Sequence, residues 1–248
     1  MLNSIVVGDC LEKMKDIPDS SIDMVLCDLP YGTTRCKWDS VISFEPLWAE
    51  YNRVCKIRAP MVFTASQPFT SQLINSNIKN FKYTWVWEKS KATGYLNAKR
   101  MPMRAHEDIC VFYRKPPLYN PQMRKGTPYN KGKALRPTEV YGRQTATLVK
   151  NDTGLRYPRT VVYFKTAESE GKVHHPTQKP VALFEYLINT YTNCGDLVLD
   201  NCIGSGTTAV AALRTKRNFI GIELDSKYAN ICNDRIKNTE EECKNAQT

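Results

Sequence analysis

Short apolar runs alternate with amphipathic stretches along most of this chain. Residues 4–7, 22–27 and 61–65 are apolar or β-branched runs of strand length, which are typical of buried strands in a parallel sheet. Residues 11–15 have the pattern of a brief helix, and the apolar residues of 44–55 follow helical spacing. This alternation of strand and helix predicts an α/β fold with a doubly wound, mostly parallel sheet.

The middle of the chain interrupts this pattern. Residues 83–87 and 109–113 predict two more strands, separated by a polar loop over residues 89–104. Residues 115–172 are rich in proline and glycine, and only residues 160–164 have the pattern of a strand, so most of this segment is predicted to be a loop-rich insertion. Regularity then returns, with helices and strands predicted at residues 181–191, 197–199, 205–213, 219–222 and from 226 onward.

The length and composition fit a single large domain that carries this insertion. The chain has 248 residues, of which 42% are hydrophobic, enough to form a sizeable core. The longest apolar runs have five residues, far short of the roughly 20 that a membrane-spanning helix needs. Residues 2–9 lack the basic and apolar regions of a secretory signal. We therefore expect no membrane span and a cytoplasmic location.

The cysteines and histidines do not form a metal-binding pattern. Nine cysteines are scattered, and none are paired at the two-residue spacing that zinc sites favour. The three histidines, His106, His174 and His175, are near no such pair. We expect reduced thiols and no metal site.

Positive charge is concentrated in the middle of the chain. The whole sequence has 35 Lys and Arg against 25 Asp and Glu, a net charge of +10, whereas residues 79–172 alone carry 20 basic and 7 acidic residues, a net charge of +13. Such a segment favours a polyanionic partner, because each base placed on a phosphate releases a condensed counterion. Interleaved tyrosines could stack on bases: Tyr119, Tyr129, Tyr141 and Tyr157. The alternative is a solvated basic surface.

A first candidate site is a strand that runs into a glycine-rich turn and a helix. Asp200 ends the predicted strand, Gly204 permits a tight turn, and Gly206 would let the backbone approach a ligand. Ala209 is small enough for the helix to pack close to its strand, and Glu223 lies 19 residues after Gly204. This spacing is near that of an acid that binds ribose hydroxyls in Rossmann-like nucleotide sites. The motif predicts an adenosine-type cofactor and leaves a dinucleotide and S-adenosylmethionine both open.

A second candidate site follows the strand 22–27. It has the sequence Asp28-Leu-Pro-Tyr-Gly32, placed where α/β sheets form their ligand crevices. Asp28 and the carbonyl of Leu29 could accept the two hydrogens of an exocyclic amine, while Pro30 keeps the turn rigid and Tyr31 stacks on the base. The alternative is a turn that only ends the strand.

Together, the two motifs resemble the amino-DNA methyltransferases, which methylate exocyclic amines with S-adenosylmethionine. Residues 28–31 are similar to the Asp-Pro-Pro-Tyr catalytic motif of that family, and 200–208 are similar to its Asp-Pro-Phe-x-Gly-Ser-Gly-Thr-Thr cofactor loop. Further resemblances cover nearly all of the chain except the basic insertion: Gly8-Asp9, His106-Glu107, His175-Pro-Thr-Gln-Lys-Pro180 and Gly221-Ile-Glu-Leu-Asp225 with Tyr228.

Two departures from the family motifs affect the expected site. Leu29 replaces the first proline but keeps the backbone carbonyl, so we expect chemistry to survive with a less rigid turn. Asn201 and Cys202 replace the usual proline and phenylalanine. A ring that would wall the cofactor is therefore missing, and we expect weaker cofactor binding unless a neighbouring aromatic side chain compensates.

The order of the motifs resembles that of the circularly permuted β class, in which target recognition lies between catalytic motif and cofactor loop. The resemblance implies a methyltransferase fold with a catalytic half at 1–114, a target-recognition insertion at 115–172 and a cofactor-binding half at 173–248. It also implies double-stranded DNA as the substrate and, with Asp rather than Ser at position 28, adenine N6 rather than cytosine N4 as the methylated atom. A homodimer is compatible with it.

The resemblance assigns roles to individual residues. Asp28 is catalytic, and Pro30 and Tyr31 receive the flipped base. The expected cofactor-binding residues are Asp9, Cys10, Asp28, Thr177, Lys179, Asp200, Gly204, Ser205, Gly206, Thr207, Glu223 and Leu224, with Gln178 also near the methionine end. Candidate phosphate contacts are Arg100, Arg104, Arg124, Lys125, Lys131 and Lys133. Simpler alternatives are a helix cap for Asp9, a surface position for Lys179 and a solvated face for the basic residues.

Three other functions remain as alternatives. A dinucleotide-dependent oxidoreductase would use the glycine loop but leaves residues 28–31 and the basic segment unexplained. A non-enzymatic DNA-binding protein rests on charge alone. Within the family, a cytosine-N4 enzyme or an RNA enzyme differs only in its product.

Overall fold

The computed structural model describes residues 2–33, 39–134, 138–140, 142–143, 145–175 and 177–245. These residues form two compact units, Met1–Asn120 with Thr160–Thr248, and Pro121–Arg159. Each unit is described by itself. Among the described residues, no helix is both long enough and apolar enough to cross a membrane.

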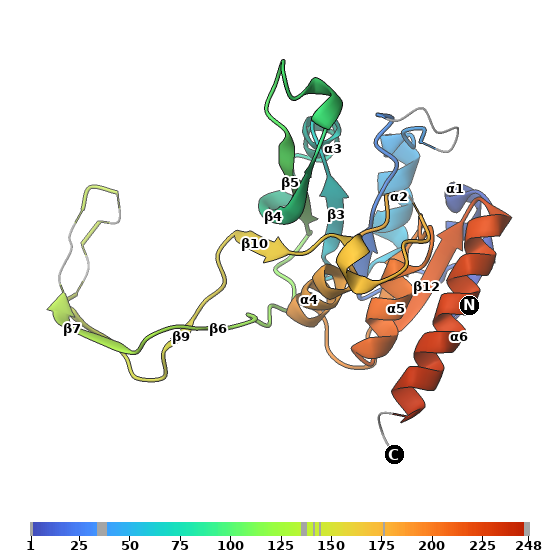
Figure 1. Cartoon of the computed structure of the whole chain (residues 1–248). Coiled ribbons are helices and arrows are strands. Elements are labelled where there is room, and N and C mark those ends of the chain that lie inside the picture. Colours follow the sequence, from blue (N-terminus) through green and yellow to red (C-terminus); the bar gives the residue numbers. More distant parts are fainter. Residues whose placement is uncertain are drawn as a thin grey trace. The chain divides into compact units, whose positions relative to one another are not determined.

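The larger unit is built on one eight-stranded sheet (Figure 1), with the strand order β1-β12-β11-β2-β3-β5-β4-β10. Only β5 is antiparallel to its neighbours; all other adjacent strands are parallel. This confirms the predicted mostly parallel sheet. The strands are β1 (Ser4–Val7), β2 (Met24–Cys27), β3 (Met61–Ala65), β4 (Phe81–Thr93), β5 (Arg104–Phe112), β10 (Val161–Phe164), β11 (Leu197–Asp200) and β12 (Asn218–Glu223).

Helices cover both faces of this sheet because buried strand residues alternate between two apolar cores. On β2, Val25 and Cys27 belong to one core, and Met24 and Leu26 belong to the other. The first core contains residues of α1 (Cys10–Met14), α2 (Phe44–Val54) and α3 (Phe69–Ser76), and the second contains residues of α4 (Val181–Tyr191), α5 (Thr207–Arg214) and α6 (Ser226–Asn245). The result is the doubly wound arrangement that the sequence predicts.

Three local expectations differ from the structure. The loop expected at 89–104 is shorter, because β4 continues to Thr93 and β5 begins at Arg104; a 3-10 helix, η1 (Tyr95–Asn97), lies between them. The first strand, β1, was expected to be buried, but it lies at the edge of the sheet and its Val7 is exposed. Helix α3 was not predicted.

The smaller unit, Pro121–Arg159, contains two short antiparallel pairs. Strand β6 (Arg124–Lys125) pairs with β9 (Leu155–Arg156), and β7 (Tyr129–Ala134) pairs with β8 (Thr147–Asn151). Nine of its residues are Lys or Arg and two are Asp or Glu. The unit lies within the expected insertion 115–172, whereas residues 160–172, with β10 and the 3-10 helix η2 (Ala167–Glu170), belong to the larger unit.

Candidate active site

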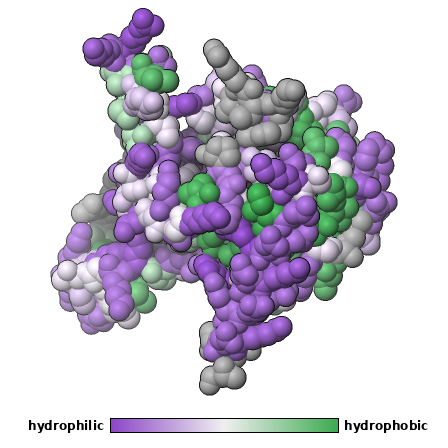
Figure 2. Space-filling view, turned by 45° about the vertical axis from the view of Figure 1, so that its right-hand side comes forward, coloured by the Kyte–Doolittle hydropathy of each residue, from purple (hydrophilic) through white to green (hydrophobic). Residues whose placement is uncertain are grey.

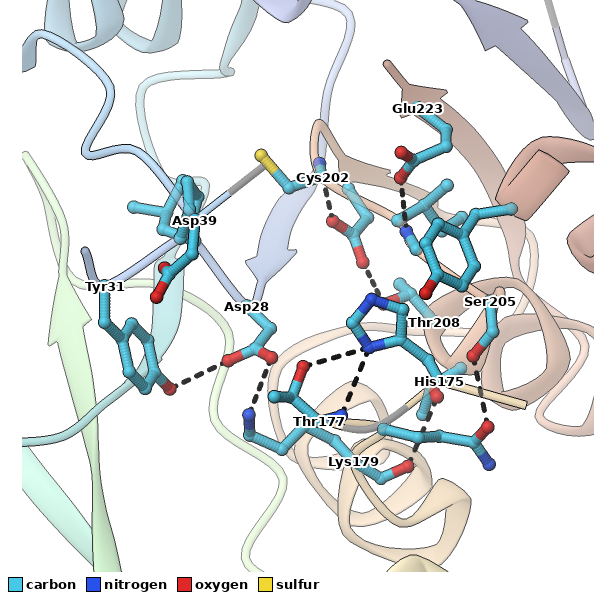
Figure 3. Close-up of a pocket in the computed structure, with 18 of the residues that line it drawn as sticks. Asp28, Tyr31, Asp39, His175, Thr177, Lys179, Cys202, Ser205, Thr208 and Glu223 are labelled. Carbon is cyan, nitrogen blue, oxygen red and sulfur yellow. Dashed lines mark hydrogen bonds and ion pairs between the residues drawn. The ribbon is translucent and has the colours of Figure 1, made fainter. Parts of the chain in front are cut away.

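A cavity of about 710 Å3 lies in the larger unit and is lined by residues from several strand ends. The motifs after β2 and β11 meet here because these strands are parallel neighbours in the sheet, so their carboxyl ends lie at the same edge. Residues following β1 and β12 line the same cavity, together with residues from β4 and the start of β5. Figure 3 shows part of this lining.

Asp28 follows β2, and its carboxylate is held by three donors. The Tyr31 hydroxyl donates to Oδ1 at 2.8 Å, and the Thr64 hydroxyl also donates to Oδ1. The Lys179 ammonium donates to Oδ2 at 2.6 Å (Figure 3). Since an ionised carboxylate has about four lone-pair positions, this arrangement fixes the carboxylate and leaves acceptor capacity on Oδ2.

Lys179 also connects Asp28 to a second buried ion pair. Its ammonium lies 3.5 Å from Glu107 Oε2, and Lys89 lies 3.3 Å from Glu107 Oε1. Only 7% of the Lys179 side chain is exposed. Burial alone would lower the pKa of Lys179, but the carboxylates of Asp28 and Glu107 outweigh this effect and raise it. Lys179 therefore stays charged beside Asp28, which corrects the alternative of a surface lysine.

Tyr31 is packed as well as hydrogen-bonded. Its ring stacks on Phe69 with a centroid separation of 5.1 Å and an interplanar angle of 23°, so one ring face is covered and at most one can receive a base. Burial raises the pKa of the Tyr31 hydroxyl. The Asp39 carboxylate accepts the backbone N–H groups of Gly32 and Thr33 at 2.8 and 2.9 Å, which holds the turn after the motif.

Asp200 stabilises the cofactor loop from inside. Its buried carboxylate accepts the Cys202 N–H at 3.1 Å and the Thr208 hydroxyl, and it thereby ties the end of β11 to the first turn of α5. Burial raises the pKa of Asp200 to about 7. This carboxylate organises the loop and lines the cavity.

The two loop glycines have different physical reasons to be glycine. Gly204 has φ +55° and open space where a Cβ would point, and it lines the cavity. A Cβ on Gly206, which has φ +90°, would lie 2.4 Å from Cys232 Sγ of α6. The expected backbone approach to a ligand therefore fits Gly204, whereas Gly206 is required for packing against α6.

Glu223 joins the end of β12 to the glycine loop. Its Oε2 accepts the Gly204 N–H at 2.8 Å, and its Oε1 accepts the Asp225 N–H at 2.9 Å. Burial raises the pKa of Glu223 against the opposing effect of these bonds. Both oxygens retain lone pairs, and the side chain and the exposed Leu224 line the cavity.

At the end of β1, Asp9 caps α1, with its carboxylate accepting the N–H groups of Leu11 and Glu12 at 2.9 and 3.2 Å. The helix-cap alternative is thus present, and Asp9 and the buried Cys10 also line the cavity.

The segment before α4 links the two motifs. Gln178 Oε1 accepts the Ser205 hydroxyl at 3.1 Å, and Thr207 donates to the backbone oxygen of Lys179 at 3.2 Å. Thr177 lines the cavity through an exposed position and hydrogen-bonds to His175 Nδ1.

The unusual residues of the cofactor loop have their own contacts. Asn201 Oδ1 accepts the buried Tyr51 hydroxyl at 2.6 Å, so Asn201 ties the loop to α2. Cys202 lines the cavity beside Cys10. Aromatic side chains elsewhere in the lining are Tyr31, Trp87, Phe184 and Tyr228.

Several contributors to this site were not singled out from the sequence. Thr64, Lys89 and Asp39 carry no motif signal, because each acts through a tertiary contact. Glu107 was noted only through the family resemblance. No cluster of three or more potential metal-ligating side chains occurs among the described residues.

The structure separates the six candidate DNA contacts into two groups. Arg104 lines the cavity and donates to Ser66 Oγ at 3.4 Å, and Arg100 is exposed between β4 and β5. Arg124, Lys125, Lys131 and Lys133 are exposed on β6 and β7 of the smaller unit. Lys131 and Arg156 both lie over the ring of Tyr129 there.

A mostly parallel α/β sheet with a glycine-loop cavity at the carboxyl ends of its strands is typical of Rossmann-like enzymes that bind nucleotide-type cofactors. The sequence model of a DNA methylase family matches residues 22–234. The chain therefore belongs to this DNA methylase family.

Individual relatives agree with this assignment. The chain is 27% identical over 252 residues to the Type II methyltransferase M1.MboII of Moraxella bovis, covering 94% of this chain and 95% of the relative. It is 25% identical over 247 residues to M.HpaI of Haemophilus parainfluenzae, covering 94% and 73%.

Two solved structures share the fold. The M1.HpyAVI–SAM complex has a TM-score of 0.63 and 26% identity, covering 94% of this chain and 98% of that chain. PvuII DNA methyltransferase, described as cytosine-N4-specific, has a TM-score of 0.65 and 17% identity, covering 94% and 85%. The first of these was solved with the cofactor, S-adenosylmethionine.

Proposed function

We propose that this protein transfers a methyl group from S-adenosylmethionine to the exocyclic N6 amine of adenine in double-stranded DNA. The observation that carries the proposal is the Asp28 carboxylate, fixed by Tyr31, Thr64 and Lys179, at the wall of the same cavity as Gly204 and Glu223. Base and cofactor can thus be held in one cavity. Holding reactants in line is the main requirement of a direct transfer.

The cavity fits the cofactor by the chemistry of its lining. Gly204 presents backbone without a side chain, Glu223 offers carboxylate lone pairs to ribose hydroxyls, and the aromatic and apolar residues suit an adenine ring. The other expected cofactor-binding residues that line this cavity are Asp9, Cys10, Thr177, Ser205, Thr207 and Leu224. When bound, S-adenosylmethionine supplies an electrophilic sulfonium methyl group.

Asp28 would accept a hydrogen bond from the exocyclic amine of the target base. A target adenine must leave the duplex stack, at a cost of about a few kcal/mol, and Pro30 and Tyr31 would receive it. Asp28 Oδ2 and the backbone carbonyl of Leu29 accept the amine hydrogens, so the nitrogen lone pair becomes available for attack. As the bond from nitrogen to the methyl carbon forms and the bond from that carbon to sulfur breaks, the carboxylate would stabilise the positive charge that develops on nitrogen. The nitrogen loses a proton after the transfer.

The smaller unit is proposed to recognise the DNA target, as in the permuted β class. The support is its charge, nine basic residues against two acidic ones, and the order of the motifs, with Asp28 before and Gly204 after this unit. Arg124, Lys125, Lys131 and Lys133 would contact phosphates. Arg100 and Arg104 would do so on the larger unit.

Cytosine N4 is the second candidate target, because PvuII methyltransferase, described as cytosine-N4-specific, shares the fold. The residue at position 28 favours adenine: it is Asp here, and the family resemblance associates Asp with adenine N6.

The test is product analysis. Purified protein, methyl-labelled S-adenosylmethionine and unmethylated duplex DNA are incubated, and the DNA is digested to nucleosides for mass spectrometry. We expect labelled N6-methyladenine. Labelled N4-methylcytosine would reject the assigned target, and label found only in RNA substrates would reject DNA.

A further inference from the structure

The turn between β4 and β5 exposes large apolar side chains. Tyr95 is 74% exposed and Leu96 is 83% exposed, with Met101 at 58% close behind them. Single apolar residues scattered over a surface are common, whereas several exposed apolar side chains grouped at the tip of one hairpin indicate a contact surface. None of the cavity's proposed chemistry uses these side chains.

The tip is ordered by its own backbone. Gly94 has φ +89° and begins η1, and the N–H groups of Asn97 and Ala98 donate to Gly94 and Tyr95 at 3.0 and 3.1 Å. Two further bonds run from Arg100 and Met101 to the Asn97 oxygen at 2.8 and 3.0 Å. Tyr95 and Leu96 are therefore presented in a preformed turn.

The hairpin is also strongly basic. Four exposed Lys and Arg residues and no Asp or Glu lie between Lys89, which is buried, and Glu107: Lys91, Lys99, Arg100 and Arg104. An apolar tip on a basic stem matches a nucleic-acid duplex, whose phosphates attract the stem and whose base stack accepts apolar groups. Two copies of this hairpin would repel each other, which argues against self-association through it.

The base of the hairpin is part of the cavity wall. Lys89 and Thr93 of β4 and Arg104 and Glu107 of β5 all line it, and Thr93 is paired with Arg104 in the ladder. In Figure 1 the hairpin extends beyond the edge of the sheet where β3 ends. The tip thus belongs to the same unit as the proposed base pocket and is continuous with its wall.

We infer that Tyr95 and Leu96 form a wedge that enters the DNA base stack beside the target adenine. The wedge would occupy stacking space that the flipped base vacates and so keep the base out of the duplex. This inference rests on the proposed function, because it assumes that the target base is rotated into the cavity.

The test compares the wild-type protein with Tyr95→Ala/Leu96→Ala on two substrates. One is a duplex carrying the methylated sequence, as mapped on enzyme-treated plasmid DNA. The other is the same duplex with an abasic site opposite the target adenine, which removes the base-pairing cost of flipping. We expect kcat/KM on the normal duplex to fall at least tenfold and to stay within about twofold on the abasic duplex, as assisted flipping requires.

Direct evidence comes from 2-aminopurine placed at the target position. The wild type should raise its fluorescence on binding, and the double variant should lose most of that increase while S-adenosylmethionine affinity is unchanged. Ile78→Ala is the matched control, because Ile78 is 63% exposed elsewhere on the larger unit. Tyr95→Phe/Leu96→Met should restore activity on the normal duplex.

Three results would contradict the inference that Tyr95 and Leu96 act as a wedge. They are full activity of the double variant on the normal duplex, an equal loss on both substrates, and a change in oligomeric state by light scattering, which would make the tip a self-association surface. Wild-type protein that methylates no site on the plasmid DNA used for mapping would reject the proposed function, and the wedge with it. Lys99→Gln/Arg100→Gln should lower kcat/KM on both substrates by the same factor, because phosphate contacts do not depend on base pairing.

Discussion

At the scale of single residues, the orientation of the carboxylate proposed to be catalytic depends on its neighbours. Asp28 does not project into solvent alone: a buried lysine ammonium holds one oxygen, and Tyr31 and Thr64 hold the other. Charge-assisted hydrogen bonds of this kind are shorter and stronger than neutral ones. Lys179 thus holds the Asp28 carboxylate in position. It also lines the cavity, where the sequence predicts a contact with the methionine end of the cofactor.

Replacing this lysine should slow methyl transfer. In Lys179→Met, both Asp28 and Glu107 lose their shared cation, so the carboxylate loses its fixed orientation. We expect the single-turnover rate to fall by about 10- to 100-fold, the range for a lost charged hydrogen bond, with DNA affinity changed little. Lys179→Arg should recover part of the rate. A Lys179→Met enzyme with the wild-type rate would contradict the positioning role.

Glu223 should determine cofactor affinity. Glu223→Gln keeps the side-chain shape but removes the negative charge and one of the two acceptor oxygens. In the wild type these oxygens accept the Gly204 and Asp225 N–H groups and, in the proposed complex, the ribose hydroxyls. We expect the Kd for S-adenosylmethionine to rise by about tenfold, measured by calorimetry without DNA. Glu240→Gln, at an exposed position of α6 outside the cavity lining, is the matched control. Unchanged affinity in Glu223→Gln would remove the ribose contact.

At the scale of elements, the site depends on how α5 starts against α6. Gly206 begins α5 with φ +90°, and Cys232 of α6 packs where its Cβ would be. This contact explains a glycine that the sequence motif alone would attribute to ligand approach. The close packing also fixes the direction in which Gly204 and Ser205 face the cavity.

A substitution at this contact should lower the free energy of unfolding more than it lowers the rate of methyl transfer. Gly206→Ala adds an overpacked methyl group and a strained backbone, so we expect a loss of about 1–3 kcal/mol in the free energy of unfolding. Urea denaturation measures it. Gly206→Ala/Cys232→Ala should recover the packing part of the loss but not the backbone part. Equal stability of Gly206→Ala and wild type would contradict this packing argument.

The elements themselves were largely readable from the sequence, since strands such as β2, β3 and β11 are short apolar runs and their helices are amphipathic. Helix α3 was missed because it follows β3 directly and has only eight residues. The inner parts of β4 and β5 were predicted as strands, but their outer parts were predicted as a loop because the residues there are mostly polar and exposed. Cross-strand pairing, not burial, extends these strands. Pairing of this kind leaves no apolar pattern in the sequence.

The site could be predicted only as far as local motifs reach. Asp28, Gly204 and Glu223 stand in recognisable patterns at strand ends. The contact between Lys179 and Asp28 joins residues 151 positions apart, and Thr64 and Lys89 lie in no motif. Such partners depend on strand order and register, which the sequence pattern does not specify.

At the scale of the whole molecule, charge is divided between parts with different chemistry. The segment of residues 79–172 carries a net charge of +13, whereas the whole chain carries +10, so the remaining residues are slightly acidic. In the space-filling view of Figure 2, hydrophilic residues dominate, and hydrophobic residues form separate patches. This distribution suits attraction of a polyanion to selected surfaces.

Removing charge from the smaller unit should therefore alter DNA affinity and leave cofactor affinity unchanged. The variant changes four basic residues together to Gln: Arg124, Lys125, Lys131 and Lys133. We expect a higher KM for DNA. The slope of log affinity against log salt should fall in magnitude by up to about four, since each lost phosphate contact removes about one. The matched control changes four exposed lysines of the larger unit: Lys15, Lys227, Lys237 and Lys244. An equal effect of both sets would show that only total charge matters.

The central claim is that the Asp28 carboxylate promotes methyl transfer to an amine in the cavity it shares with the cofactor. The most direct measurement is the single-turnover rate of Asp28→Asn, with S-adenosylmethionine and DNA affinities determined on the same preparation. We expect the rate to fall by at least about 100-fold, as for other groups that stabilise developing charge, while both affinities stay within a few fold of wild type. A wild-type rate in Asp28→Asn would contradict the claim.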